Sequence, residues 1–225
     1  MGPLACAAGL LHALLAAWMG WPPSPSGHAA GAAVAGAMGG ERFLYFAYGS
    51  NLLAERLRIN NPSAERVAAA RLDGYRLDFG YMSPRWGGHA ATVVPQPGRV
   101  VWGAVWSVGQ EHLDDLDRQE GVQSGVYVPI QVDVHSSDGR KLHCRSYHLQ
   151  EQPPTPLPEG LLITEGRLPS KIYWQVIVQG ARETGLPSDY IDFLEKIPHN
   201  DFMGNFSIGQ LASNLHEINT PLDNK

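Results

Sequence analysis

Apolar and polar residues follow two different spacings from residue 42 onward, and these spacings predict a succession of short strands and helices. Alternating or continuous apolar and aromatic residues are typical of strands, whereas apolar residues three or four positions apart are typical of helices. The predicted strands cover residues 42–48, 71–81, 89–95, 100–108, 126–136 and 141–150. The predicted helices cover residues 51–61, 110–120, 171–184 and 188–197.

Glycines and short polar segments mark where these elements bend or stop. Gly74 predicts a kink in the strand that holds it, and residues 96–98 (Gln-Pro-Gly) predict a turn between two strands. Residues 137–139 (Ser-Asp-Gly) predict a hairpin. Gly121 and Gly185 follow predicted helices and are candidate C-terminal caps, because glycine adopts the left-handed conformation without strain.

Other boundaries follow from capping residues and prolines. Ser50 or Asn51 is expected to cap the first helix, and Ser188 the last one. Residues 171–184 fit a helix, but their apolar side chains also alternate, so a strand fits this segment as well. Residues 153–169 contain five prolines and predict an exposed loop.

The order of these elements narrows the fold class. The predicted strands come in local hairpins, and they do not alternate with long helices as in a doubly wound parallel sheet. The pattern favours an α+β fold, either a small mixed β-barrel or a twisted open sheet.

Residues 1–40 differ from the rest of the chain, since they contain no Lys, Arg, Asp or Glu and are rich in Ala and Gly. The apolar run in residues 4–21 fits a signal peptide that lacks its positive start, a marginal membrane anchor, or an extension without a fold. We expect a folded domain over residues 41–206, preceded by this extension and followed by a loose polar tail at 207–225.

Composition and motif content exclude several function classes. With a net charge of −5 and 17 basic residues, the chain has no nucleic-acid footprint. Two cysteines exclude a disulfide scaffold, and Cys144 is expected to be an inert core thiol. The nine histidines lack metal-ligand spacing, so no metal site is expected. The nucleophile elbow, the phosphate-binding loop and the dinucleotide fingerprint are also missing from the sequence.

Residues 48–51 (Tyr-Gly-Ser-Asn) are the first candidate for chemistry, because they lie where a predicted strand meets a predicted helix. Backbone N–H groups at such a junction lack partners and can bind an anion or a developing oxyanion. Gly49 would let a ligand come close to the backbone. A tight turn with a helix cap explains the same residues without any site.

Glu120 and three tyrosines are the other candidates. Glu120 fits a solvated surface charge, but in a dry pocket its pKa would rise, so that it could exchange protons near neutral pH. Tyr127, Tyr147 and Tyr173 are candidates as well, although most buried tyrosines are core residues with a satisfied hydroxyl.

Several segments together resemble the γ-glutamylcyclotransferase family. They are FLYFAYGSNLL at 43–53, NPSA at 61–64, RLDGYRLDFG at 71–80, GGHAATVVP at 87–95, VWGAVW at 101–106, LDDLDRQEGVQSGVYVPI at 113–130 and CRSY at 144–147. The pairing of YGSN with a later Glu-Gly is specific, because the sister families resemble YGSL or a YGT-type loop. The resemblance runs from about residue 43 to about residue 205.

The resemblance implies a small mixed β-barrel flanked by helices, and an enzyme that converts γ-glutamyl amino acids into 5-oxoproline and a free amino acid. It implies no metal or cofactor, a cytosolic location and a homodimer. The catalytic glutamate falls on Glu120, and the substrate-binding residues fall on Tyr45, Phe46, Ala47, Tyr48, Gly49, Ser50 and Tyr173.

Two departures from the family pattern leave alternatives open. Residues 1–40 are unlike the family's short polar start, so secretion or anchoring is an alternative to the cytosol. Residues 156–168 form a longer loop just before Tyr173, which bears on the role of that tyrosine. The alternatives for function are the same fold acting on glutathione or γ-glutamyl-ε-lysine, and a non-catalytic binding module.

Overall fold

The computed structural model describes residues 40–204, so nearly all of the predicted N-terminal extension and the whole predicted tail lie outside the described residues. In chain order the elements are β1 (Arg42–Ala47), η1 (Ser50–Leu52), α1 (Ala54–Arg58), β2 (Glu65–Ser83), β3 (Gly88–Gly109), η2 (Gln110–His112), α2 (Leu113–Gln119), β4 (Tyr127–Ser136), β5 (Lys141–Leu149), α3 (Lys171–Thr184) and α4 (Ser188–Glu195).

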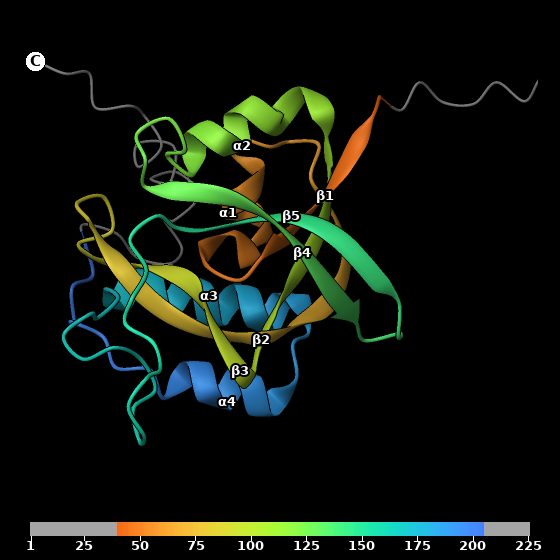
Figure 1. Ribbon diagram of the computed structural model, residues 1–225. Coiled ribbons are helices and arrows are strands. Elements are labelled where there is room, and N and C mark those ends of the chain that lie inside the picture. Colours follow the sequence, from red (N-terminus) through yellow and green to blue (C-terminus); the bar gives the residue numbers. More distant parts are fainter. Residues whose placement is uncertain (1–39, 205–225) are drawn as a thin grey trace, which may run out of the picture. The chain divides into compact units, whose positions relative to one another are not determined.

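Five strands close into a barrel in the order β1-β3-β2-β4-β5 (Figure 1). Every neighbouring pair is antiparallel except β1 and β5, which run parallel where Tyr45 lies opposite Arg145. The predicted small mixed barrel is therefore confirmed. The open twisted sheet is wrong, because the β1–β5 pairing removes both free edges at this point.

The predicted turn at residues 96–98 is wrong, since β3 is one long strand that bulges there. Asp73 pairs with Val100 and Tyr75 pairs with Pro95, so residues 96–99 bulge out opposite Gly74. Gly74 has a positive φ of 80°, which produces the predicted kink. The two predicted strands are thus halves of β3 that both pair with β2.

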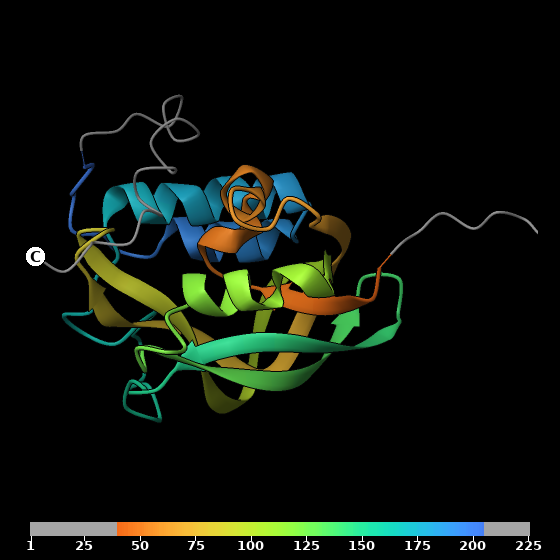
Figure 2. The ribbon, with the colours of Figure 1, turned by 90° about the horizontal axis from the view of Figure 1, so that it is seen from above.

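Helices α3 and α4 lie next to each other on one side of the barrel, and the β4–β5 hairpin lies on the other (Figure 2). The helix alternative for residues 171–184 is confirmed. Gly185 ends α3 in the left-handed conformation with φ of 71°. Between residues 40 and 204, none of the helices has the length and apolar character needed to cross a membrane.

The predicted caps of the first and last helices are wrong. Ser50 and Asn51 belong to the short η1 turn, and α1 starts after Leu53 without a side-chain cap. Ser188 is the first residue of α4, whose N-cap is Pro187. At both places the side chain that the sequence offers as a cap is inside a helical turn, so its hydroxyl or amide is free for other contacts.

Most residues of the proline-rich loop are exposed, as predicted, and a buried ion pair anchors the loop to the barrel. Arg76 and Asp78 lie on β2 with an Nη2–Oδ2 distance of 2.7 Å. Asp78 accepts hydrogen bonds from the backbone N–H and the hydroxyl of Thr164, at 2.9 and 2.8 Å, and Arg76 donates to the Pro154 carbonyl at 2.6 Å. Ile163 is 4% exposed. The loop therefore lies against the barrel before the chain enters α3.

Candidate active site

Glu120 is held at the end of α2 by a glycine-terminated helix cap. The backbone N–H of Gly121 donates to the Arg118 carbonyl at 3.1 Å, and that of Val122 donates to the Asp117 carbonyl at 3.0 Å. This pair of bonds is the Schellman motif, which needs a left-handed residue; Gly121 supplies it with φ of 67°. Gly121 thus confirms the predicted cap and turns the chain sharply after Glu120.

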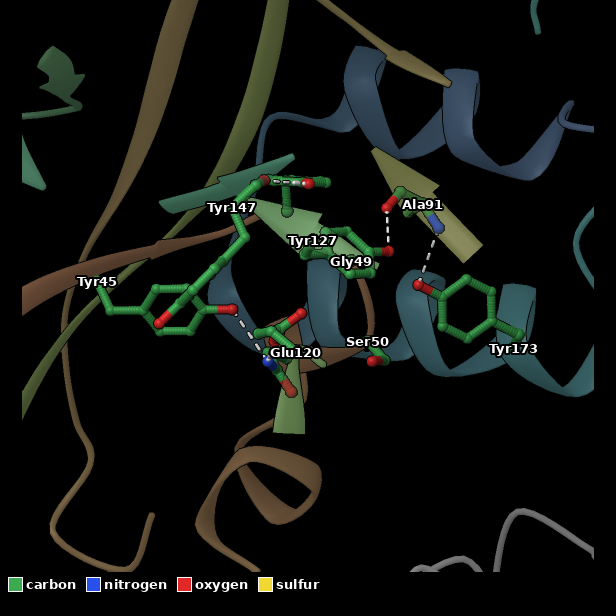
Figure 3. Close-up of a pocket in the computed structure, with 10 residues that line it drawn as sticks. Tyr45, Gly49, Ser50, Ala91, Glu120, Tyr127, Tyr147 and Tyr173 are labelled. Carbon is green, nitrogen blue, oxygen red and sulfur yellow. Dashed lines mark hydrogen bonds between the residues drawn. The ribbon is translucent and has the colours of Figure 1, made fainter. Parts of the chain in front are cut away.

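Glu120 borders a small cavity that five tyrosines surround (Figure 3). Residues of β1, η1, β4, β5, α3 and the first half of β3, together with Glu120 at the end of α2, line the cavity. Its lining residues are Tyr45, Tyr48, Gly49, Ser50, Asn51, Ala91, Glu120, Tyr127, Tyr147 and Tyr173.

Burial gives the Glu120 carboxyl a pKa of about 7, raised from its ordinary value near 4.5. The raised value results mainly from the loss of water around the carboxylate. The positive charge of Arg56 and hydrogen bonding to Asn51 and Tyr45 oppose it, and the negative charge of Asp117 adds to it. Asn51 Nδ2 donates to Glu120 Oε1 at 2.8 Å. At neutral pH both protonation states of Glu120 are therefore populated.

The Asn51 side chain links the η1 turn to Tyr45 on β1 and to Gln119 and Glu120 at the end of α2. Its Nδ2 donates to the Tyr45 hydroxyl at 2.9 Å as well as to Glu120, and its Oδ1 accepts from Gln119 Nε2 at 2.9 Å. The side chain expected to cap a helix instead orients the acidic group. Its amide protons also stabilise the ionised form of Glu120.

Tyr127 and Tyr173 are fixed by a backbone edge of β3 that has no neighbouring strand. This half of β3 pairs only with β2, so the peptide groups on its other side need partners. Tyr127 donates its hydroxyl to the Ala91 carbonyl at 2.6 Å, and the Ala91 N–H donates to the Tyr173 hydroxyl at 3.2 Å (Figure 3). Tyr173 thus accepts from β3 and keeps its own proton for a ligand in the cavity.

The start of α3 orients the Tyr173 ring. Ser170 caps α3 by accepting from the Tyr173 N–H at 3.2 Å, and Trp86 packs against the ring with centroids 4.8 Å apart. Burial raises the pKa of Tyr173 to about 12, so its hydroxyl stays protonated at neutral pH.

Tyr173→Phe should lower kcat/KM for a cavity-bound substrate by about ten- to a hundredfold. The substitution removes a hydrogen bond to a charged group, worth about 1.5–3 kcal/mol, and keeps the packing of the ring. Steady-state kinetics of the purified variant measure the effect. Tyr75→Phe is the matched control, because Tyr75 lies on β2 and does not line the cavity. A loss under about twofold for Tyr173→Phe would mean that this hydroxyl does not touch the substrate.

An ion pair holds α2 against β5 behind the cavity. Arg145 Nη2 donates to both carboxylate oxygens of Asp117, at 2.7 and 2.8 Å, and Arg145 Nε donates to the Tyr147 hydroxyl at 2.9 Å. Tyr147 in turn donates to Asp117. These contacts fix the last turn of α2, and therefore the direction in which Glu120 points.

The backbone at Gly49 reaches the cavity with free donors. Within residues 40–204, the N–H groups of Gly49, Ser50 and Asn51 donate to no protein acceptor. A Cβ on Gly49 would lie 3.2 Å from the Tyr173 hydroxyl oxygen, so a side chain there would crowd this part of the wall. The arrangement can bind a carboxylate or a developing oxyanion.

Six of the eight residues suggested by the resemblance line the cavity; Phe46 and Ala47 do not. Both are at most 1% exposed and belong to the core cluster. The structure brings Tyr127 and Tyr147 into the same cavity, where the sequence had left a core role open. Sequence reasoning missed Ala91, whose backbone alone takes part, and the pairing of Asn51 with Glu120. No local sequence signal identifies either one.

The described residues offer little else for catalysis. Within residues 40–204, no three His, Cys, Asp or Glu side chains gather in a way that could hold a metal ion. Cys144 is a free, fully buried thiol whose pKa burial raises to about 12, which fits the inert core thiol expected. The chemistry available in the cavity is therefore proton transfer by Glu120 and hydrogen bonding by tyrosines and backbone amides.

Comparisons with known proteins agree with this picture. The AIG2-like family matches residues 100–194. The chain is 45% identical over 172 residues to "Gamma-glutamylcyclotransferase" of Bos taurus, which covers 75% of this chain and 85% of the relative. It is 43% identical over 171 residues to the protein of that name from Homo sapiens, with coverage of 74% and 85%. A solved structure called "Gamma-glutamyl cyclotransferase" has a TM-score of 0.67 and 40% identity, and covers 79% of this chain and 99% of its own.

Proposed function

Because this chain belongs to the γ-glutamylcyclotransferase family, we propose that it cleaves γ-glutamyl amino acids with Glu120 as the single acid–base group. The chain is an enzyme of this type, which acts on small γ-glutamyl compounds and forms 5-oxoproline. The proposal adds the preferred substrate and the residues. One observation carries it: a carboxyl group with a pKa of about 7 borders a small cavity of neutral hydrogen-bonding side chains.

In the proposed reaction the substrate's own α-amine attacks its γ-carbonyl carbon, and a five-membered lactam closes. Both reacting groups belong to one molecule, so the enzyme mainly has to bend it into the reactive shape. The cavity beside Glu120 is small and walled by tyrosines, so a γ-glutamyl group would have to fold to enter it. The ring of tyrosines would exclude water and favour that conformation over an extended one.

Glu120 is proposed to carry the protons. The α-ammonium loses two protons on its way to the lactam N–H, while the leaving nitrogen gains two and departs as an ammonium group. As a carboxylate Glu120 takes a proton from the α-nitrogen, and as a carboxylic acid it donates one to the leaving nitrogen. A pKa close to the working pH suits both halves of this cycle.

The backbone N–H groups and the tyrosines of the cavity are proposed to bind the charged and polar groups of the substrate that do not exchange protons. The free backbone N–H groups of Gly49, Ser50 and Asn51 would bind either the α-carboxylate of the glutamyl group or the oxyanion on the γ-carbonyl. Tyr173, whose hydroxyl lies next to Gly49, would donate its proton to the substrate. Tyr45 and Tyr48 would complete the pocket as neutral groups, because burial raises the pKa of each well above 10.

Product analysis tests this function directly. The purified chain is incubated with γ-glutamylalanine, glutathione and γ-glutamyl-ε-lysine, and 5-oxoproline and the released amine are quantified. We expect 5-oxoproline and alanine in equal amounts from γ-glutamylalanine, at the highest kcat/KM of the three. A higher kcat/KM for glutathione or γ-glutamyl-ε-lysine would assign the chain a different preference, and no product from any of them would favour a binding module.

The pH dependence of kcat/KM should report the ionisation of Glu120. Burial disfavours the carboxylate, so the active base forms only as the pH rises through about 7. We expect kcat/KM for γ-glutamylalanine to rise about tenfold per pH unit up to about pH 7 and then to level off. Rates between pH 5 and pH 9 in constant-ionic-strength buffer measure the curve. An apparent pKa near 4.5 would mean that Glu120 is fully hydrated in the free enzyme.

We also propose a homodimer in the cytosol without nucleic-acid or membrane partners. The support is the family resemblance together with the net charge of −5. Light scattering coupled to gel filtration tests the oligomer, and a mass near the 24.5 kDa of one chain would contradict the dimer. Cell fractionation tests the location, and recovery with membranes or in the medium would contradict the cytosol.

A further inference from the structure

Arg56 is a buried arginine whose guanidinium nitrogens Nε and Nη1 have no hydrogen-bond partner in the described part of the chain. It lies on α1 and is 4% exposed. Its Nε and Nη1 are shielded from solvent and donate to no acceptor. The negative charge of Glu120 acts on Arg56, but the two side chains form no ion pair in direct contact. Burying guanidinium N–H groups without an acceptor is unfavourable, so these nitrogens point to an anion that binds from outside the chain.

Arg56 forms part of the wall of a groove that continues from the tyrosine-lined cavity. The groove is open to solvent. Four residues line both the groove and the cavity, namely Ser50, Glu120, Tyr127 and Tyr173. Glu120 therefore stands at the junction of the two spaces, and Arg56 borders only the groove.

The charges along the groove favour an anionic occupant. Besides Arg56, the wall includes Arg85 and Arg118, and Glu120 is its only acidic residue. Arg118 is already paired with Asp115 at 2.7 Å, and Arg85 is exposed to solvent. Arg56 is thus the cation in this groove that combines burial with a free guanidinium, which is where a charged hydrogen bond is strongest.

We infer that Arg56 binds the α-carboxylate of the leaving amino acid and so selects γ-glutamyl amino acids over γ-glutamyl amines and amides. The inference rests on the proposed function. The scissile amide bond has to lie beside Glu120, at the junction of the two spaces. The γ-glutamyl half then occupies the cavity, and the leaving half extends into the groove, where its free carboxylate meets the guanidinium.

The planar guanidinium suits this role. It presents several N–H donors in a fixed geometry that matches the two oxygens of a carboxylate. A γ-glutamyl amine, or a leaving group whose carboxylate is an amide, offers no such acceptor and leaves the guanidinium unpaired. Discrimination of about ten- to a hundredfold is expected from one charged hydrogen-bonding group.

The test compares γ-glutamyl-L-alanine with γ-glutamyl-L-alaninamide, which differ only at the carboxyl group. The wild-type chain should favour the acid in kcat/KM by at least about tenfold. Arg56→Met should lower kcat/KM for the acid by about ten- to a hundredfold and that for the amide by less than about threefold. Arg58→Met is the matched control on the same helix, because Arg58 is exposed and outside the groove, and it should keep the wild-type ratio.

Two kinds of result would overturn the inference. The first is a wild-type kcat/KM that is equal for the acid and the amide. The second is an Arg56→Met variant that loses kcat/KM equally on both substrates and so keeps the wild-type ratio of acid to amide. An equal loss would mean that Arg56 acts on the glutamyl half or on Glu120. Circular dichroism checks that Arg56→Met folds. If it does not, the inference is tested by the wild-type comparison and by Arg56→Lys. We expect Arg56→Lys to retain a reduced but measurable preference for the acid over the amide. Failure of the wild type to release 5-oxoproline from either substrate would overturn the proposed function itself.

Discussion

Replacing Glu120 by glutamine should lower kcat for 5-oxoproline formation by about 10²–10⁴, while substrate still binds. Glutamine keeps the shape of the side chain, and its Oε1 can still accept the hydrogen bond from Asn51. It cannot take up or release the proton that has to move between the two nitrogens of the substrate. Single-turnover product assays measure the loss, and isothermal titration calorimetry with γ-glutamylalanine measures the retained binding.

Two controls separate chemistry from folding for this variant. Glu55→Gln makes the same chemical change at an exposed position of α1 and should leave kcat unchanged. The raised pKa of Glu120 means that folding stability falls as the pH rises from about 4.5 through about 7, because the unfolded state then gains more from ionisation. Glu120→Gln should therefore be at least as stable as the wild type at pH 8. Near-normal turnover of Glu120→Gln would refute the acid–base role.

Gly180→Ala should destabilise the fold by about 1–3 kcal/mol, although alanine is the better helix former. Gly180 lies inside α3 where the helix meets the η1 turn. An added Cβ would lie 2.5 Å from the Leu53 nitrogen and 2.6 Å from the Leu52 carbonyl carbon, and these backbone atoms cannot rotate away. The helix and the turn would have to separate, and with them Tyr173 and Asn51. Thermal unfolding should show a Tm lower by about 2–4 °C per kcal/mol.

Gln179→Ala is the matched control, because Gln179 precedes Gly180 in α3 and faces solvent. It changes helix propensity without touching the η1 turn, so its Tm should stay within about 2 °C of the wild type. Activity should fall in Gly180→Ala and not in Gln179→Ala. A Tm of Gly180→Ala at or above that of the control would mean that the helix–turn contact has room for a methyl group.

The sequence predicts the elements whose signals are local. The hairpin of β4 and β5, the helix that ends at Gly185 and the glycine after Glu120 all follow from spacing and turn chemistry within a few residues. The bulge in β3 does not, because a Gln-Pro-Gly segment predicts a turn unless a neighbouring strand continues past it. The bulge lies opposite Gly74 of β2, which is more than twenty positions away in the sequence, so local spacing does not reveal it.

The site was only partly predictable for the same reason. Glu120 and the turn at Gly49 stand out once the family resemblance is noticed, whereas the groups that tune them come from contacts between distant parts of the chain. Asn51 offers a helix cap in the sequence, but its amide reaches a carboxylate 69 positions later. The clamp on Ala91 depends on an unpaired strand edge, which only the closed barrel defines. Arg56 looks like an ordinary helix residue until its burial is known.

The wall of the tyrosine-lined cavity is assembled from seven elements between Tyr45 and Tyr173, and this has a consequence for any shortened or split version of the chain. No contiguous fragment holds both the first and the last of these residues without nearly all of the barrel between them. A partly folded chain is not expected to have partial activity, because the tyrosines and Glu120 come together only in the closed barrel. Enzymatic activity is therefore a direct measure of the completely folded population, and two inactive fragments that regain it when mixed must have rebuilt the closed barrel.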